Sequence, residues 1–198
     1  MGAAKKLKLV SVEDYLAGEL RSQIKHEYLG GVIHAMGSFT NKHNVIAMNV
    51  LASLHGKLKG RRFRPFNSSA KVRVRLPTHI RFYYPDMSVV CPSNSPDESF
   101  QDAPVVIVEV LSASTRRTDL SEKKDAYLTI PTLSAYLLVE QAEPAVVAFR
   151  RTNDGFVREV YAGLDAVIGL PEIETELTLS EVYEDVTFTL EPGEDDTA

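Results

Sequence analysis

Hydrophobic residues recur along this chain at the two spacings that are typical of strands and of helices. Residues 71–76 alternate strictly, which predicts a strand with its apolar side chains facing inward and an outward basic stripe of Lys71, Arg73 and Arg75. The other predicted elements are strands at residues 82–91, 105–111 and 136–140, hairpins at residues 26–36 and 145–161, and helices at residues 11–20, 41–58 and about 119–130.

The predicted helix at residues 41–58 is the longest element, and Thr40 or Asn41 is expected to cap it. Apolar residues recur in it at three- and four-residue spacings, and we expect the following side chains to face the core: Val45, Met48, Leu51, Ala52, Leu54 and Leu58. Strands that are apolar throughout, alternating strands and a few helices together predict a mixed β-sheet flanked by helices, an α/β (α+β) fold.

Glu109 stands inside the apolar run at residues 104–111. An ionised carboxylate in such a strand costs several kcal/mol unless it is paired, protonated or bound to a metal. A second acid, Asp86, opens the apolar segment at residues 87–91. Two carboxylates from neighbouring strands suit a hard divalent cation, so we interpret Asp86 and Glu109 as metal ligands.

The charge of the chain is distributed unevenly. The formal net charge is −5, but residues 159–198 contain 12 acidic residues and neither lysine nor arginine. Residues 1–158 therefore hold all 22 basic residues, and nine of these lie between Lys57 and Arg81 without an acid among them. This segment is a candidate phosphate-binding surface, and a solvated basic face is the equally weighted alternative.

Length and composition limit the protein class. A chain of 198 residues with 44% hydrophobic content can bury one core, which predicts a single domain. One cysteine, Cys91, allows no intramolecular disulfide and no cysteine-rich zinc site. No stretch approaches the roughly 18 apolar residues of a membrane span. We therefore expect a cytoplasmic protein that uses neither a membrane nor a nucleotide cofactor.

Several segments together resemble the Uma-two family, which belongs to the PD-D/E-x-K nuclease superfamily. They are Tyr84-Pro85-Asp86, Val108-Glu109-Val110-Leu111-Ser112, Ser114-Thr115, Asp119-x-x-x-Lys123-x-x-x-Tyr127, Tyr136-Leu-Leu-Val, His26-Glu27-Tyr28-Leu29-Gly30-Gly31 and His43-Asn44. The resemblance implies a restriction-endonuclease-like domain over residues 11–186, between an N-terminal extension at residues 1–10 and an acidic tail at residues 187–198 that we expect to be disordered. It also implies hydrolysis of DNA with Mg²⁺ or Mn²⁺.

The resemblance assigns roles to individual residues. Asp86 and Glu109 would ligate the metal, and the carbonyl of Val110 could be a further ligand. Such a cation neutralises charge in the transition state of phosphodiester hydrolysis and makes water nucleophilic. Glu27 resembles an additional acid that many members place near the site, and a salt-bridge partner on the hairpin is the alternative.

The chain departs from the superfamily pattern at Leu111, where the motif has a lysine that faces the same side of the strand as Glu109. Lys123 is the candidate replacement, because Asp119, Lys123 and Tyr127 recur at four-residue spacing on one side of the following helix. The alternative is that Asp119 and Lys123 form an ordinary pair on the helix surface while Tyr127 packs in the core.

Other polar residues have weaker assignments. His43 lies at the start of the long helix and could meet a phosphate or a carboxylate, although a structural histidine is the more common case. Arg116 and Arg117, in the loop after the Glu109 strand, are candidates for contacts with the DNA backbone, as are Arg73 and Arg75. Enzymes that cut both strands often pair two active sites, so we expect a homodimer.

Three functions remain open at this point. The first is a metal-dependent DNA endonuclease, in which Asp86, Glu109 and Lys123 converge. The second is a nucleic-acid-binding module of the same fold that has lost catalysis, which Leu111 makes credible. The third is a hydrolase that uses the carboxylate pair without metal, such as a glycosidase, against which the absence of tryptophan argues mildly.

Overall fold

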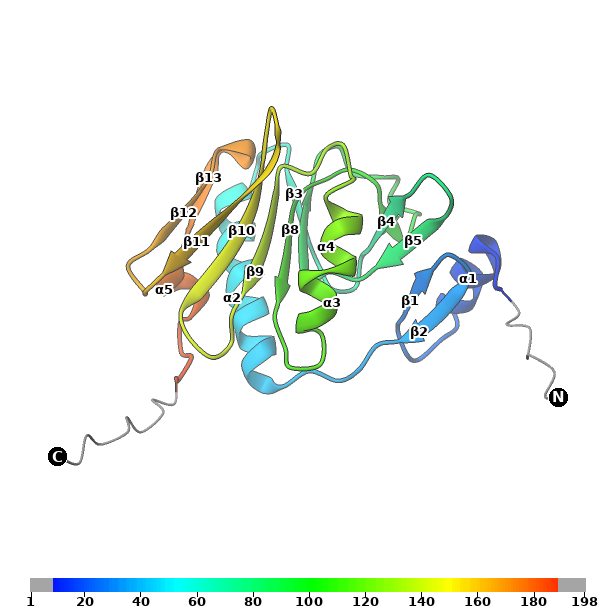
Figure 1. Ribbon diagram of the computed structural model, residues 1–198, viewed down its shortest axis with the longest axis horizontal. Helices are drawn as coiled ribbons and strands as arrows, with labels where there is room; N and C mark the ends of the chain where they lie inside the picture. Colours follow the sequence, from blue (N-terminus) through cyan, green and yellow to red (C-terminus); the bar gives the residue numbers. More distant parts are fainter. Residues whose placement is uncertain (1–8, 189–198) are drawn as a thin grey trace.

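A six-stranded mixed sheet forms the centre of the protein, whose computed structural model describes residues 9–188 (Figure 1). The apolar run that contains Glu109 forms its strand β8, which pairs in parallel with β9 and antiparallel with β6. From edge to edge the sheet consists of β11 (Gly155–Ala162), β10 (Ala145–Thr152), β9 (Ala135–Val139), β8 (Pro104–Val110), β6 (Met87–Val90) and β3 (Arg64–Asn67).

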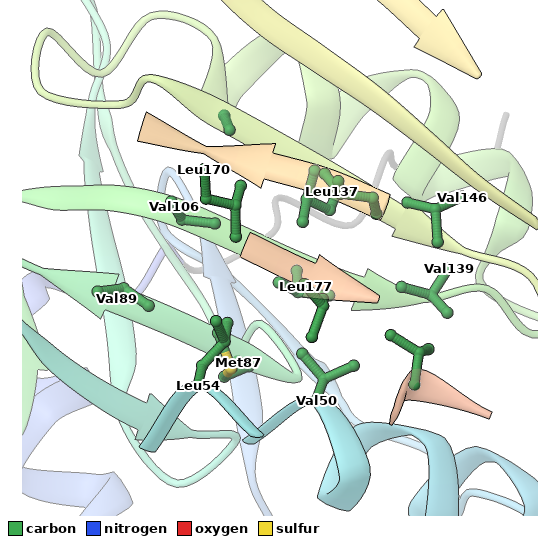
Figure 2. Close-up of a cluster of buried hydrophobic side chains, with 14 of the residues drawn as sticks. Val50, Leu54, Met87, Val89, Val106, Leu137, Val139, Val146, Leu170 and Leu177 are labelled. Atoms are coloured by element: carbon green, nitrogen blue, oxygen red, sulfur yellow. The ribbon is translucent and has the colours of Figure 1, made fainter. Parts of the chain in front are cut away.

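The two faces of β8 meet different cores because successive side chains of a strand point in opposite directions. Val106, Val108 and Val110 belong to one hydrophobic core, shown in part in Figure 2. Ile107 and Leu111 belong to a second core on the other face. Glu109 shares this second face by position, so the strand presents a carboxylate between two buried apolar side chains.

Helix α2 (Asn41–Leu58) covers the first core, and the C-terminal part of the described chain closes it. This C-terminal part consists of β12 (Val167–Leu170), the 3-10 helix η1 (Pro171–Ile173), β13 (Thr175–Thr178) and α5 (Leu179–Val182). Side chains from α2, the sheet and these elements interdigitate in Figure 2, among them Val50, Leu54, Met87 and Leu177. The arrangement fixes α2, and with it His43, against the six-stranded sheet.

A five-stranded sheet lies beside the second core. Its strands in spatial order are β2 (Val32–Ala35), β1 (His26–Leu29), β5 (Ile80–Tyr83), β4 (Lys71–Arg75) and β7 (Phe100–Gln101). On one face, Val72, Val74 and Tyr83 pack into the second core. On the other face, Phe82 packs with aromatic residues and with Tyr15 of helix α1 (Val12–Glu19).

Two short helices, α3 (Arg116–Leu120) and α4 (Glu122–Tyr127), occupy the space between the two sheets (Figure 1). Ala126 and Tyr127 of α4 pack against Ile107 and Leu111 of β8 in the second core. We expected one helix at residues 119–130, which is wrong, because the backbone leaves helical geometry at Ser121, with φ −125° and ψ −89°. Asp119 and Lys123 consequently lie on two successive helices.

The strand expected at residues 82–91 is also wrong. It is two strands, β5 and β6, which belong to different sheets. Tyr84, Pro85 and Asp86 separate them, and Pro85 has no backbone N–H to offer to a neighbouring strand. The chain crosses from one sheet to the other at this point, so that Asp86 stands at the entrance of β6.

The buried face of α2 differs from the expected one. Val45 and Met48 are exposed, with Met48 retaining 60% of its accessible surface, whereas Ile46 and Val50 are fully buried. Leu54 and Leu58 are buried as expected. The helix has apolar residues around much of its circumference, so spacing alone left its rotation about the axis undetermined.

Several local predictions are confirmed. The hairpins β1–β2 and β10–β11 form in antiparallel register, and Ser11 and Thr40 accept hydrogen bonds at the starts of α1 and α2. In the described part of the chain, no helix is long and apolar enough to cross a membrane. Most of the expected N-terminal extension and of the acidic tail lies outside the described residues, in the segments 1–8 and 189–198.

Candidate active site

Asp86 and Glu109 lie next to each other because β6 and β8 are antiparallel. Met87 pairs with Val108, which places the residue before Met87 opposite the residue after Val108. Asp86 Oδ2 accepts a hydrogen bond of 2.7 Å from the backbone N–H of Val110. Both carboxylates are buried, with 8% of Asp86 and 4% of Glu109 exposed. The sheet therefore brings together two acids that are 23 positions apart in the sequence.

Lys123 extends from α4 into the same space. Its Nζ lies 3.0 Å from Glu27 Oε1, 3.3 Å from Glu109 Oε1 and 3.5 Å from Asp119 Oδ1. The expected lysine position on β8 is taken by Leu111, whose side chain is buried in the second core against α4. The ammonium thus approaches Glu109 from the helix that covers this face of the strand.

Burial and the attraction between Lys123 and the carboxyl groups are the largest effects on the pKa values in this cluster. Burial raises the pKa of the Glu109 carboxyl well above its usual value, Lys123 opposes that rise, and Asp119 and Asp86 add to it. Burial likewise raises the pKa of Asp119. For Lys123, burial lowers the pKa, but attraction to Glu109 and the other carboxylates outweighs it and raises the pKa above the usual value. Lys123 is consequently an ammonium, and its positive charge lies within 3.5 Å of three carboxyl groups.

Tyr127 combines the two roles that its sequence position left open. Its ring is fully buried and packs edge-on against Tyr83, 5.3 Å between centroids, and against Tyr136. Its hydroxyl donates a hydrogen bond of 3.2 Å to Glu109 Oε1. A core aromatic residue therefore fixes one oxygen of the buried carboxylate.

His43 is held against Asp86 from the first turn of α2. Its Nε2 lies 3.1 Å from Asp86 Oδ2, and its ring stacks on Phe39 with 4.2 Å between centroids. The hydroxyl of Thr40 caps the backbone N–H of His43 at 3.2 Å. Nδ1 of His43 is buried and makes no hydrogen bond within the described residues.

Gln141 is a site residue that the sequence reasoning missed. Its Nε2 donates a hydrogen bond of 2.6 Å to the carbonyl of Leu111, and its Oε1 accepts one of 3.3 Å from Thr40. The side chain therefore connects the end of β8 to the start of α2, the two elements that carry Glu109 and His43. The signal in the sequence was a pair of polar residues, Glu140 and Gln141, directly after the apolar strand β9.

The buried acids, His43 and Lys123 line a pocket of about 160 Å³. The pocket wall combines the acidic cluster with residues of the β2–α2 loop and of the segment before and within α3: Glu27, Ala35, Met36, Gly37, Ser38, Phe39, His43, Tyr84, Asp86, Glu109, Val110, Ser114, Thr115, Thr118, Asp119 and Lys123. Glu27 Oε1 and Asp119 Oδ1 are buried and form no hydrogen bond, although both face Lys123. The pocket is therefore rich in acceptor oxygens that are not fully engaged.

The donor set suits a hard divalent cation only in part. In residues 9–188 no group of three or more histidine, cysteine, aspartate and glutamate side chains is arranged to hold a metal ion. Asp86 and Glu109 offer two carboxylates, and Val110 also lines the pocket. Mg²⁺ is commonly bound through one or two carboxylates, with waters and substrate phosphates completing its shell. The residues present fit that mode of binding, and they do not form a closed protein cage.

The arginines expected to contact DNA are largely engaged with acids. Arg73 forms a two-point ion pair with Asp102, at 2.7 and 2.6 Å, and Arg116 forms another with Glu140, at 2.6 and 2.8 Å. Arg75 and Arg117 are exposed. The prediction of an outward basic stripe on residues 71–76 is wrong for Lys71, which is buried with 4% of its surface exposed.

Comparisons with known proteins agree with this architecture. The model of the Uma2 family, described as "Putative restriction endonuclease", matches residues 12–181. The uncharacterized protein slr1290 of Synechocystis sp. is 33% identical over 147 residues, which cover 74% of this chain and 76% of that protein. The uncharacterized protein sll1609 of the same organism is 28% identical over 150 residues, covering 74% and 84%.

A solved structure shows the same fold. The crystal structure of a "putative nuclease belonging to DUF820" from Anabaena variabilis superposes with a TM-score of 0.66 at 21% identity, and covers 84% of this chain and 96% of that one. This likeness confirms the expected mixed α/β fold. Together with the match over residues 12–181 it confirms the resemblance stated from the sequence, and the chain belongs to the Uma2 family of restriction-endonuclease-like proteins.

Proposed function

We propose that this protein is a metal-dependent endonuclease that hydrolyses phosphodiester bonds of DNA. The observation that carries the proposal is the convergence of Asp86, Glu109 and Lys123 in one buried cluster beside a pocket. Lys123 comes from helix α4, whereas the superfamily motif has its lysine on the strand that carries the acid. Membership in a nuclease-like family implies a nucleic-acid substrate. DNA is our assignment within that class.

Asp86, Glu109 and the carbonyl of Val110 would hold Mg²⁺ or Mn²⁺. When bound, such a cation supplies neutralisation of the charge that develops on the phosphate and a lower pKa for attacking water. Asp86 is prepared for this role by the N–H of Val110 and by His43, which fix its Oδ2. Glu109 is oriented by Tyr127 and Lys123, which both contact its Oε1.

Lys123 acts in this proposal as a fixed positive charge rather than as a base. Three carboxylate oxygens surround its ammonium within 3.5 Å, so its proton is strongly held. An ammonium in this position orients water by donating hydrogen bonds and stabilises negative charge near the scissile phosphate. Glu27 is the acceptor closest to Lys123, and apart from this ion pair its Oε1 has no hydrogen-bond partner within residues 9–188. We assign to Glu27 the orientation of a water on that side of the pocket.

A second function, nucleic-acid binding without cleavage, is favoured by one observation. Leu111 replaces the motif lysine and is integrated into the hydrophobic core, so the strand itself offers no cation beside Glu109. Under this alternative, Lys123 only balances the charge of the acids around it. Binding of DNA by the parent protein without any metal-dependent cleavage would identify this case.

The proposal includes the organisation of the protein. We propose that residues 11–186 form one catalytic domain and that two copies act together as a homodimer in the cytoplasm, so that two active sites cut both strands of a duplex. Analytical ultracentrifugation with and without DNA tests the dimer. A monomer in both conditions would contradict it.

Cleavage of supercoiled plasmid tests the function. The parent protein is expected to nick or linearise plasmid in Mg²⁺ or Mn²⁺ and to lose this activity in EDTA, and Glu109→Gln is expected to be inactive in either metal. Asp125→Asn is the matched control, because Asp125 lies on α4 with 74% of its side chain exposed, away from the cluster. Cleavage by Glu109→Gln at the rate of Asp125→Asn would reject the proposed site, because a contaminating nuclease would explain that activity.

A further inference from the structure

Two lysines lie beside the pocket, and one of them, Lys71, is the buried member of the basic stripe expected from the sequence. Lys25 precedes β1 and Lys71 opens β4, and both ammonium groups lie against the ring of Tyr84, 5.6 Å and 5.1 Å from its centroid. Tyr84 lines the pocket and is two residues before Asp86. The two lysines are 46 positions apart in sequence, and the fold brings them to one aromatic ring.

Neither lysine forms an ion pair with a carboxylate in the part of the chain that the structure describes, unlike Arg73, Arg116 and Lys123. Lys25 donates a hydrogen bond of 2.7 Å to the carbonyl of Ser68. Glu19 attracts Lys71, but it already accepts hydrogen bonds from Tyr84 and from His26. Within residues 9–188, two cations are therefore held near each other without a carboxylate partner.

We propose that Lys25, Lys71 and Tyr84 form a subsite for a backbone phosphate of the nucleic-acid substrate, adjacent to the phosphate that is cleaved. This inference rests on the proposed function in its choice of substrate and adds the place where the strand is held. Lysine contacts to phosphates position a nucleic acid without reading its sequence, and two such charges would fix the strand relative to Asp86 and Glu109.

The electrostatics of the two lysines agree with an anion site. Burial lowers the pKa of Lys71, and repulsion from Lys25 lowers it further against the attraction of Glu19. Burial also lowers the pKa of Lys25, against the attraction of Asp86. An anion between the two ammonium groups would reduce both their mutual repulsion and the free-energy cost of burying their charges. A phosphate would therefore bind more tightly here than at an isolated surface lysine.

The acidic lining of the pocket is the reason for placing the phosphate subsite outside it. Glu27, Asp86, Glu109 and Asp119 repel a polyanion, and Lys123 is already shared among three of these acids. A strand that delivers a phosphate to this acidic pocket needs positive charge on a neighbouring surface to offset the repulsion. Lys25 and Lys71 supply it on the side of the pocket formed by Tyr84.

The salt dependence of DNA binding tests the subsite without requiring cleavage. Binding of a short duplex is measured in EDTA at several salt concentrations for the parent, Lys25→Met, Lys71→Met and the double variant. Each phosphate contact contributes about 0.9 to the slope of log K against log salt. We expect each single variant to reduce the slope by about one and the double variant by about two, equally for duplexes of different sequence. Arg158→Met is the control, because Arg158 is an exposed basic residue on β11, an edge strand of the six-stranded sheet, and lies outside the basic segment between Lys57 and Arg81.

The outcomes separate the subsite from the nuclease. A reduced slope in a parent protein that never cleaves DNA would keep the subsite and reject the nuclease. Cleavage by the parent, with Lys25→Met and Lys71→Met retaining the slope of Arg158→Met, would keep the nuclease and reject the subsite. A parent that binds no DNA would also overturn the subsite. Lys71 is buried, so if Lys71→Met does not fold, Lys25→Met decides alone, because Lys25 is exposed.

Discussion

Lys123 Nζ lies 3.3 Å from Glu109 Oε1, although the two residues belong to different elements, α4 and β8. In the superfamily motif the lysine and the acid share one strand. Here Leu111 occupies the position of the motif lysine, and its apolar side chain packs against α4. The positive charge beside Glu109 comes instead from Lys123 of α4. Because the lysine is on α4, the position of its ammonium group depends on how α4 packs on the sheet.

The first prediction concerns the stability of this buried cluster. Removing one partner of a buried ion pair leaves uncompensated charge and costs about 3–5 kcal/mol. We expect Lys123→Met to lower the free energy of unfolding by an amount in this range. Adding Glu109→Gln to Lys123→Met should cost less than the sum of the single changes, with a coupling of at least about 1 kcal/mol. Urea unfolding of the four proteins at one pH measures the cycle, and strictly additive losses would show that the two side chains do not interact.

Gln141 gives a second prediction. Its side chain satisfies the carbonyl of Leu111 and contacts Thr40 at the start of α2. Gln141→Leu leaves that carbonyl without this donor, which costs about 1–3 kcal/mol. We also expect the rate of cleavage at saturating DNA to fall while affinity for DNA stays near that of the parent, because the change shifts β8 against α2. Single-turnover cleavage and binding assays measure the two effects, and a variant with parental rate and stability would contradict the bridging role.

The ion pair between Arg73 and Asp102 predicts a pH dependence of stability. Burial raises the pKa of Asp102, but hydrogen bonds from Arg73 and Asn94 and the charges of Arg73 and Arg75 outweigh it and leave the pKa below its usual value. A depressed carboxyl pKa gives stability that is present above the unfolded value of about 3.9 and is lost as the pH falls through the folded value. Asp102→Asn should therefore cost about 1 kcal/mol at pH 7.

This cost of Asp102→Asn should shrink as the pH falls below about 4, because the parent then loses the same charge. Denaturant unfolding of both proteins at several pH values measures the difference. A difference that stays constant from neutral to acidic pH would show that the loss comes from packing rather than from the charge of Asp102.

The rotation of α2 can be tested with two substitutions on one helix. Leu54 is fully buried, so Leu54→Ala should lower the free energy of unfolding by about 2–5 kcal/mol. Met48 is 60% exposed, so Met48→Ala should change it by no more than about 0.5 kcal/mol. Thermal and denaturant unfolding measure both. A large loss for Met48→Ala would mean that Met48 contacts another surface, such as a second copy of the chain.

Much of the site was predictable because its signals are local. Glu109 is conspicuous as a charge in an apolar run, and Asp86 stands at the start of another, so burial and the sheet bring both to one place. The spacing of Lys123 within its helix indicated the side it faces. The break at Ser121 was missed, yet Asp119 still lies 3.5 Å from Lys123 across the two helices.

The features that the sequence did not predict depend on contacts between residues that are far apart in the chain. Arg73 is paired with Asp102, 29 residues away, and an alternating pattern describes only the strand that carries Arg73. Lys71 is buried by Tyr84 and its surroundings rather than by its own strand. The strands at residues 64–67, 167–170 and 175–178 are short and partly exposed, so their hydrophobic pattern is weak.

Lys123 of α4 is proposed to supply the ammonium group that strand β8 does not provide beside Glu109. Single-turnover cleavage of plasmid with saturating Mg²⁺ tests it directly, with Lys123→Met compared with Lys124→Met, a neighbouring lysine that pairs with exposed Asp125. We predict that Lys123→Met lowers the rate by at least about a hundredfold, as the loss of a positioned group that stabilises transition-state charge does. Lys124→Met should cleave like the parent. Equal rates for the two folded variants would contradict the account.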